Sequence, residues 1–319
     1  MLRLGVVGVG HLGKFHAEKC RAMEGVELVG VADISHRRAG TIASRLDVQS
    51  FFSHKDLLGR VDAVSVVVPT HDHFTVARDF LAAGVHVLVE KPITRTLEEA
   101  DALIALAKEN DLALQVGHVE RFNPAMAAAF PLTGRPLFIE ANRIGSFPQR
   151  GSDIDVVLDL MIHDIDIALH LVQEDPQSIQ AVGVPVVSPR VDIANARLEF
   201  GGGCVANLTA SRISNRSQRK VRVFQRDAYL SIDYIRHEVN VVRRLPPDAS
   251  GLSTVKSEKL PVSPGDALEK EIKSFVQAVT TRSAPVVSGE DGRRALAVTI
   301  RILADIRARQ GDWFDGQES

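Results

Sequence analysis

The chain has 319 residues, which at roughly 150 residues per domain corresponds to about two domains. The formal net charge is −2, so the sequence lacks the basic excess that binding to nucleic acid or to a membrane surface requires. Its apolar runs are shorter than the ~18 residues of a membrane-spanning helix. Two cysteines, Cys20 and Cys204, cannot form a disulfide framework, and we expect a cytoplasmic protein.

The first 117 residues alternate short apolar runs with helical stretches. The expected strands are 3–9, 26–32, 61–68, 85–89 and 112–116, and the expected helices are 11–23, 37–46, 75–83 and 97–110. Such alternation predicts parallel βαβ units with helices on both faces of the sheet. We therefore predict a doubly wound Rossmann domain over residues 1–117.

A glycine-rich loop follows the first expected strand and opens the first expected helix. Its sequence is Gly8-Val9-Gly10-His11-Leu12-Gly13. Gly8 permits a tight turn, Gly10 lets the backbone approach a pyrophosphate, and Gly13 allows the helix to pack closely on the strand. We expect these residues, His11 and Leu12 included, to bind a dinucleotide whose phosphates face the helix N-terminus.

An acidic residue, Asp33, ends the second expected strand, 20 residues after Gly13. A carboxylate at this place binds the ribose hydroxyls of an adenosine half and repels a 2′-phosphate, so it favours NAD over NADP. Arg37 and Arg38 follow closely. We expect them on the solvated face of the next helix; the alternative is that they bind a 2′-phosphate.

Polar clusters follow the third and fourth expected strands, where ligands of parallel sheets bind. The clusters read Pro69-Thr70-His71-Asp72-His73 and Glu90-Lys91-Pro92. The histidines lack the further ligands of a full metal site, so we expect no metal. We expect contacts to the nicotinamide half of the cofactor from Pro69, Thr70, His73, Glu90 and Lys91.

The pattern changes after residue 117, where β-rich runs dominate. These runs are 137–142, 179–187, 192–200, 204–212, 219–225, 228–233 and 238–243. They predict an antiparallel sheet in a second, substrate-binding and oligomerisation domain over residues 118–319. Residues 245–265 are expected to be a surface loop, and 267–280 and 290–309 to be amphipathic helices.

One expected helix, over residues 155–170, carries two Asp-x-x-x-His pairs. Asp159 and His163 are four residues apart and therefore share one helix face, and Asp166 and His170 repeat the spacing. A carboxylate one turn from an imidazole can orient it and stabilise its protonated form, which suits a general base for an alcohol.

Two further polar segments are candidates for substrate contacts. Glu120, Arg121 and Asn123 open the second domain, and their alternative role is that of a polar interdomain linker. A basic run comprises Arg212, Arg216, Arg219 and Lys220. Three roles are possible for this run from the sequence: a solvated sheet edge, an anion site or a subunit interface.

The glycine loop, the Pro-Thr-x-x-His turn and the Glu-Lys-Pro turn, in this order and spacing, resemble the Gfo/Idh/MocA oxidoreductase family. The resemblance implies a Rossmann domain followed by an α+β domain with a large open antiparallel sheet. It also implies hydride transfer between a nicotinamide and a sugar or cyclitol hydroxyl. Catalytic roles are implied for Lys91, Asp159 and His163, although many relatives have Gly where this chain has Met161.

Two segments, 117–124 and 157–166, further resemble a subgroup of UDP-N-acetylglucosamine 3-dehydrogenases, which act in a lipid A-type pathway. With NAD as cofactor, we expect oxidation at C3 of the sugar, a diphosphate bound by the basic run, and a homo-oligomer. The alternatives are an inositol or simple-sugar dehydrogenase and, from another class, a non-catalytic dinucleotide-binding sensor. Such a sensor would be expected to lose Lys91 or His163, and both are present.

Overall fold

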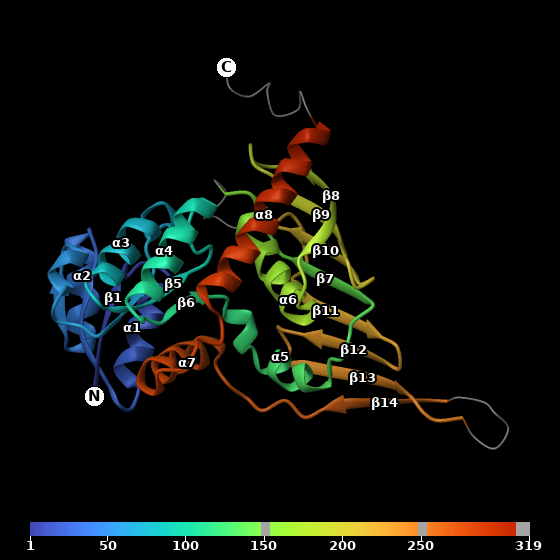
Figure 1. The fold of residues 1–319 in the computed structure, drawn as a ribbon, viewed down its shortest axis with the longest axis horizontal. Helices are drawn as coiled ribbons and strands as arrows, with labels where there is room; N and C mark the ends of the chain where they lie inside the picture. Colours follow the sequence, from blue (N-terminus) through green and yellow to red (C-terminus); the bar gives the residue numbers. More distant parts are fainter. Residues whose placement is uncertain (148–153, 248–253, 311–319) are drawn as a thin grey trace. The chain divides into compact units, whose positions relative to one another are not determined.

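The computed structural model describes residues 1–147, 154–247 and 254–310 (Figure 1). The chain divides into two units, each with its own sheet. The first unit comprises Met1–Val119 and Asp266–Leu296, and the second comprises Glu120–Gly265 and Ala297–Ser319. A segment late in the sequence therefore folds with the N-terminal sheet. Among the described helices, none is both long and apolar enough to cross a bilayer.

The first unit contains a six-stranded sheet in the order β3-β2-β1-β4-β5-β6, with every pairing parallel. This order is that of a Rossmann sheet, as predicted, and its strand order reverses between β1 and β4. The strands are β1 Leu2–Val7, β2 Val26–Ala32, β3 Gln49–Phe51, β4 Ala63–Val66, β5 His86–Glu90 and β6 Leu114–Gly117. The helices of this unit are α1 Gly13–Ala22, α2 His36–Leu46, α3 Thr70–Ala82, α4 Leu97–Glu109 and α7 Ala267–Thr281, with a short 3-10 helix at His54–Leu57.

The core of the first unit forms because its strands are apolar on both faces and helices cover both. On one face α1 packs against α2 and α7, and on the other α3 packs against α4 (Figure 1). Buried Ile272 and Phe275 of α7 join the same apolar cluster as Leu4 and Val6 of β1. Cys20 of α1 belongs to this cluster too, and burial raises the pKa of its thiol to about 12.

The second unit contains an eight-stranded sheet in the order β14-β13-β12-β11-β7-β10-β9-β8. All pairings are antiparallel except that of β7 with β10, which confirms the predicted large, mostly antiparallel sheet. The strands are β7 Phe138–Ile144, β8 Pro176–Val184, β9 Ile193–Phe200, β10 Val205–Ser211, β11 Gln218–Gln225, β12 Ala228–Asp233, β13 Glu238–Arg244 and β14 Val255–Leu260.

The expectation of a loop over residues 245–265 was wrong for its second part, because β14 is a strand. Val255–Leu260 pairs antiparallel with β13 at the edge of the sheet. Its side chains are mostly exposed, so the apolar alternation that reveals a half-buried strand is missing. Residues 248–253 lie outside the described part of the chain.

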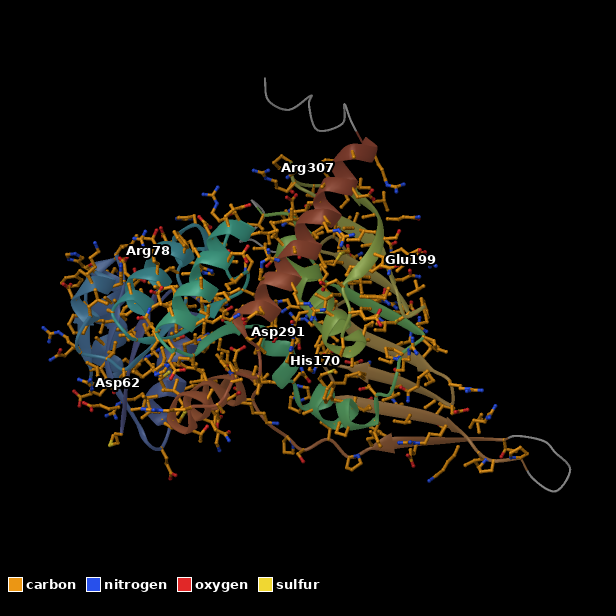
Figure 2. The ribbon with its side chains drawn as sticks, in the orientation of Figure 1. Asp62, Arg78, His170, Glu199, Asp291 and Arg307 are labelled. Atoms are coloured by element: carbon orange, nitrogen blue, oxygen red, sulfur yellow. The ribbon has the colours of Figure 1, made fainter. Side chains whose placement is uncertain are left out.

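One face of the second sheet is covered by helices, whereas the other is lined by polar side chains. The helices of this unit are α5 Pro124–Ala129 and α6 Ile162–Val172, short 3-10 segments at Val119–Phe122 and Phe130–Leu132, a π-helical turn at Val157–Met161 and the end of α8 Gly289–Gln310. α5 packs on β12 and β13, and α6 on β7 and β10 (Figure 1). Along β9, buried Ala196 and Leu198 alternate with exposed Arg197 and half-exposed Glu199 (Figure 2). Figure 2 shows Glu199 on the side of the sheet away from α6 and α8.

The contact between α7 and the first sheet predicts a large effect of one core substitution. Phe275→Ala removes a fully buried ring from the cluster that joins α7 to β1, so it should lower the free energy of unfolding by about 3–5 kcal/mol. Gln277→Ala, on the exposed face of the same helix, is the control and should stay within about 0.5 kcal/mol of the parent. Urea denaturation followed by fluorescence and circular dichroism measures both. Equal stabilities of the two variants would contradict this packing.

Candidate active site

The glycine loop joins β1 to α1 and has the geometry that a dinucleotide-binding turn requires. Gly8 has a φ of 86°, and a Cβ there would lie 2.5 Å from the Val67 carbonyl oxygen. A Cβ on Gly13 would lie 1.7 Å from the Gly8 carbonyl oxygen, so the helix start packs directly on the loop. A Cβ on Gly10 would meet nothing within 4 Å. This open side lets a phosphate reach the backbone at the start of α1, where the helix dipole favours an anion.

These residues therefore fit a dinucleotide. His11 and Leu12, which follow Gly10 in the loop, are exposed. NAD bound there would have its pyrophosphate at the N-terminus of α1 and its adenosine ribose near Asp33, which ends the adjacent strand β2.

The carboxylate of Asp33 ties the glycine loop to the helix that follows β2. It accepts hydrogen bonds from the backbone N–H groups of Val9 (3.0 Å) and Ser35 (2.8 Å) and from the guanidinium of Arg38 (2.9 Å). Burial would raise the pKa of Asp33, but these bonds outweigh it and hold the pKa below its usual value. Arg37 and Arg38 lie exposed on α2, as expected, and Arg38 in addition pairs with Asp33.

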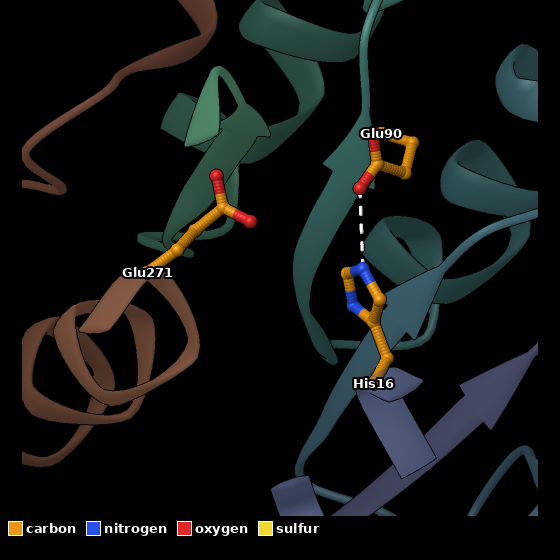
Figure 3. A group of neighbouring side chains, drawn as sticks. All are labelled: His16, Glu90 and Glu271. Atoms are coloured by element: carbon orange, nitrogen blue, oxygen red, sulfur yellow. Dashed lines mark hydrogen bonds and ion pairs between the residues drawn. The ribbon is translucent and has the colours of Figure 1, made fainter. Parts of the chain in front are cut away.

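Glu90 ends β5 (Figure 3), and Lys91 begins the turn that follows. Glu90 Oε1 lies 3.1 Å from Nε2 of His16 in α1, and Glu90 Oε2 accepts from the backbone N–H of Lys91 at 3.2 Å. The other ring nitrogen of His16 lies 2.9 Å from Oγ of Ser65 in β4. Lys91 itself is half-buried. A chain of hydrogen bonds thus connects α1 to the backbone of the predicted catalytic lysine.

The cluster after β4 forms the start of α3 rather than an open turn. Pro69 is exposed at the helix N-terminus and Thr70 is half-buried in its first turn. His73 is 1% exposed, and its ring nitrogens lie 2.8 Å from the Pro92 carbonyl and 2.9 Å from the Val68 carbonyl. The expected cofactor contact of His73 is therefore corrected: its ring holds the turn after Lys91 to the start of α3. Burial lowers the pKa of His73, although the hydrogen bonds to the two carbonyls act in the opposite direction.

The helix that carries Asp159 and His163 departs from the regular geometry that the sequence predicts. Residues Val157–Met161 form a π-helical turn, and α6 starts directly after it. Such turns are rare and concentrate at functional sites. Asp159 lies within the turn and His163 in the first turn of α6, and both side chains are half-buried.

Two buried arginines hold α6. The guanidinium of Arg143, on β7, donates two hydrogen bonds to Asp164 (3.0 Å each) and one to Glu120 (2.7 Å). Burial alone would lower the pKa of Arg143, but the two carboxylates outweigh it and raise the pKa, so the side chain remains charged. Asp164 immediately follows His163, so this ion pair fixes the backbone next to the predicted base.

The second Asp-x-x-x-His pair has a structural role. Arg121 donates to Asp166 at 2.6 and 2.8 Å and approaches Nδ1 of His170 at 3.2 Å. Since a guanidinium only donates, Nδ1 of His170 must accept, which assigns the ring proton to Nε2. His170 also stacks on Phe130, with 4.5 Å between ring centroids. Arg121 and Asp166 are almost completely buried in this arrangement, 4% and 1% exposed.

The three candidates at the start of the second unit point into the protein. Glu120 pairs with Arg143. Arg121 pairs with Asp166. Asn123 caps α5, accepting from the Ala125 N–H, and donates to Glu120. The polar groups of these three residues form hydrogen bonds and ion pairs with other buried groups of the protein. This arrangement fits a structural role for the segment, which was the alternative to substrate contacts.

Arg212 is also structural, which corrects its assignment to the substrate. It is 1% exposed and donates to Asp192 (2.8 Å), to the Ile154 carbonyl (2.6 Å) and to Ser188 (2.9 Å). Asp192 additionally accepts from three successive backbone N–H groups, of residues 186 to 188. The rest of the basic run differs, since Arg216 and Arg219 are exposed and Lys220 is half-buried.

Sequence reasoning overlooked three side chains of these networks, His16, Arg143 and Glu271. A polar residue on the apolar face of a helix was the available signal for His16 and Glu271. A ring nitrogen of His16 and one carboxyl oxygen each of Glu90 and Glu271, atoms of the kinds that bind metal ions, lie within 4.8 Å of one another. His16 and Glu90 are already hydrogen-bonded to each other, so we assign no metal to this group.

Comparisons with known proteins agree with this fold. Residues 2–118 match the family model of the oxidoreductase family with an NAD-binding Rossmann fold, and residues 134–231 match the Gfo/Idh/MocA C-terminal domain. The chain is 41% identical over 311 residues to a UDP-N-acetylglucosamine 3-dehydrogenase of Acidithiobacillus ferrooxidans, covering 96% of this chain and 98% of that one. A solved structure of that enzyme superposes with a TM-score of 0.91 at 40% identity and the same coverage of each chain.

Inositol dehydrogenases are more distant relatives. A myo-inositol 2-dehydrogenase of Thermotoga maritima is 27% identical over 319 residues, 92% of this chain and 93% of that protein. A scyllo-inositol dehydrogenase of Lactobacillus casei, solved with NAD(H) and scyllo-inositol, shares the fold with a TM-score of 0.81 at 19% identity, covering 97% of this chain and 98% of that one. On these matches and on its own geometry, the chain belongs to the Gfo/Idh/MocA oxidoreductase family.

Proposed function

We propose that this protein is an NAD-dependent dehydrogenase that oxidises the C3 hydroxyl of UDP-N-acetylglucosamine. The observation that carries the proposal is 41% identity over 96% of the chain to an enzyme of that activity. The sequence also retains Lys91, Asp159 and His163, which the family resemblance marks as catalytic. A non-catalytic sensor would not need these three residues together.

The proposed chemistry divides between a cofactor and three side chains. NAD supplies the acceptor for the hydride that leaves C3 of the sugar. The Lys91 ammonium lowers the free-energy cost of negative charge on the reacting oxygen. His163 accepts the hydroxyl proton as general base, and Asp159 orients its imidazole and stabilises the protonated ring. The π-helical turn that contains Asp159 supports a functional role for this segment.

The proposed substrate carries a diphosphate, for which the exposed part of the basic run provides cations. Arg216 and Arg219 are exposed and Lys220 is half-buried, and Arg219 lies 3.9 Å from the carboxylate of Glu120, so we propose Arg216 and Lys220 as the main contacts to an anion. Arginine suits phosphate because its planar fork forms two parallel charge-assisted hydrogen bonds. The buried Arg212 is no longer part of this proposal.

We further propose that the protein works in the cytoplasm as a homo-oligomer of two or four copies. The uncovered face of the second sheet supports the oligomer, because its polar side chains form ladders across strands. Asn195 donates to Thr209 at 2.9 Å, and Arg222 pairs with Glu140. A broad sheet face of this kind offers a surface to a second copy.

The catalytic assignment predicts that two substitutions strongly lower turnover without affecting cofactor binding. Lys91→Ala and His163→Ala should each lower kcat by about 10²-fold or more, the usual contribution of an acid–base group. NADH affinity, measured by fluorescence titration, should stay within about twofold, because the glycine loop and Asp33 hold the other half of the cofactor. Lys55→Ala, at an exposed lysine, is the matched control. Normal turnover in both variants would disprove the assignment.

The Asp33–Arg38 pair predicts the cofactor preference. The parent protein should bind NADH more tightly than NADPH, because the Asp33 carboxylate repels a 2′-phosphate. Asp33→Ser removes that charge and releases Arg38, so it should raise NADPH affinity and weaken NADH binding, each by roughly tenfold. The double variant Asp33→Ser/Arg38→Ala should lose the NADPH gain. A parent that binds both cofactors equally would show that Arg38 already turns to the phosphate.

The substrate proposal is tested by comparing three compounds at saturating NAD. UDP-N-acetylglucosamine, N-acetylglucosamine and myo-inositol differ in the diphosphate and in the ring. NADH formation should occur with the first alone, since the other two lack the anion that the basic run would bind. Equal or faster oxidation of myo-inositol would instead favour the inositol dehydrogenase alternative.

A further inference from the structure

Glu271 is a buried carboxyl group to which the reaction above assigns no role. Its side chain is 0% exposed, on the face of α7 that also carries buried Ile272 and Phe275. Neither of its carboxyl oxygens hydrogen-bonds to any residue in the described part of the chain. An ionised carboxylate without hydrogen bonds in such a place is strongly unfavourable, so this group must be neutral or must share a charge with a neighbour.

The neighbours of Glu271 are the residues that hold the turn of Lys91 (Figure 3). Its carboxyl oxygen, Nε2 of His16 and a carboxylate oxygen of Glu90 all lie within 4.8 Å of one another. In Figure 3 the three side chains converge from α7, α1 and β5. Gly117 closes another side, since a Cβ there would lie 3.1 Å from the Glu90 carboxyl.

Few charged groups surround these carboxyls. α1 contributes His16 and also Lys19, which pairs with Asp266 at 2.7 Å. β5 contributes Glu90, followed by Lys91. Strand β6 contributes the neutral Gln115, whose Nε2 donates to the backbone carbonyl of Glu271 at 3.1 Å.

Two carboxyl groups this close cannot both be ionised without a large cost, and their surroundings decide which one keeps the proton. Burial would raise the pKa of Glu90, but the hydrogen bond and charge of His16, together with Lys91, hold it below its usual value. Burial and the charge of Glu90 raise the pKa of Glu271 well above its usual value. The proton therefore belongs to Glu271 and the negative charge to Glu90.

We propose that Glu271 is a positioning residue whose protonated carboxyl donates a hydrogen bond to the Glu90 carboxylate, directly or through one water. Glu90 then accepts from His16, from the Lys91 N–H and, directly or through that water, from Glu271. This arrangement fixes the start of the Glu90-Lys91-Pro92 turn and with it the Lys91 ammonium. The expected effect on turnover rests on the proposed catalytic role of Lys91. The assignment of the proton to Glu271 is independent of that role.

The first experiment compares three substitutions in the holoenzyme. Glu271→Gln keeps a neutral donor of the same shape, so its kcat should stay within about threefold of the parent. Glu271→Leu keeps the volume but removes the donor, so its kcat should fall at least tenfold while NADH affinity changes less than twofold. Glu269→Gln, on the exposed side of α7, is the control and should behave as the parent. A parent-like kcat in Glu271→Leu overturns the positioning role.

The second experiment measures the proton itself and needs no substrate. Because the raised pKa makes the folded state bind more protons than the unfolded state, stability is fully present below the unfolded pKa of about 4.3 and falls as pH rises toward the folded pKa. The Tm of the parent should therefore decrease relative to that of Glu271→Gln between pH 5.5 and 8.5. A constant difference between the two Tm values overturns the proton assignment.

Two further outcomes distinguish the alternatives. If Glu271→Gln loses as much kcat as Glu271→Leu, the group acts as a carboxylate and the proposal fails. If metal analysis of the purified parent finds one zinc ion per chain that Glu271→Gln lacks, a cation and not a proton joins the two carboxyls. Inactivity of the parent on UDP-N-acetylglucosamine would contradict the proposed substrate alone, because the Tm comparison still tests the proton.

Discussion

The carboxylate of Glu90 holds together two segments at the carboxyl ends of the strands in the first sheet. It connects α1, which the glycine loop begins, to the turn that carries Lys91. The hydrogen-bonded chain runs from Ser65 through His16 to Glu90 and the Lys91 backbone. The helix that follows the glycine loop and the turn of Lys91, for which we propose cofactor and substrate contacts, are therefore joined by one hydrogen-bonded network. A buried anion suits this purpose because it accepts several directional bonds at once.

The second unit solves the same positioning problem with buried cations. Arg143 and Arg121 pair with Asp164 and Asp166, two acidic residues of the helix that carries His163. Buried ion pairs contribute little net stability compared with apolar packing, but removing one partner is costly. Their value here is orientation, because two bidentate contacts from outside α6 leave the helix no freedom to rotate. The half-buried His163 follows the orientation that its neighbours impose.

Sequence reasoning predicted five of the six strands of the first sheet and the glycine loop because these depend on local patterns, and it missed the three-residue strand β3. Continuous apolar runs and a glycine spacing remain visible without a partner. Pairing partners are not visible in this way: Glu271 lies 181 positions after Glu90, and nothing in its amphipathic helix indicates the N-terminal sheet. The edge strand β14 was missed for a related reason, since its polar side chains carry no alternation and its existence depends on β13.

The sequence motifs contain two kinds of polar residue, which differ in how exposed their side chains are. His73, Glu120, Asn123 and Arg212 lie in or near the sequence motifs, yet all are at most 7% exposed, and their polar atoms bond to the protein. Lys91, Asp159 and His163 are only half-buried. A group that must exchange a proton or meet a substrate has to keep part of its surface accessible, whereas a group that holds a turn or a helix works best when water is excluded. The motifs of this chain thus contain both half-buried residues, for which we propose a role in the reaction, and buried residues that hold turns and helices. The residue types alone do not distinguish the two kinds.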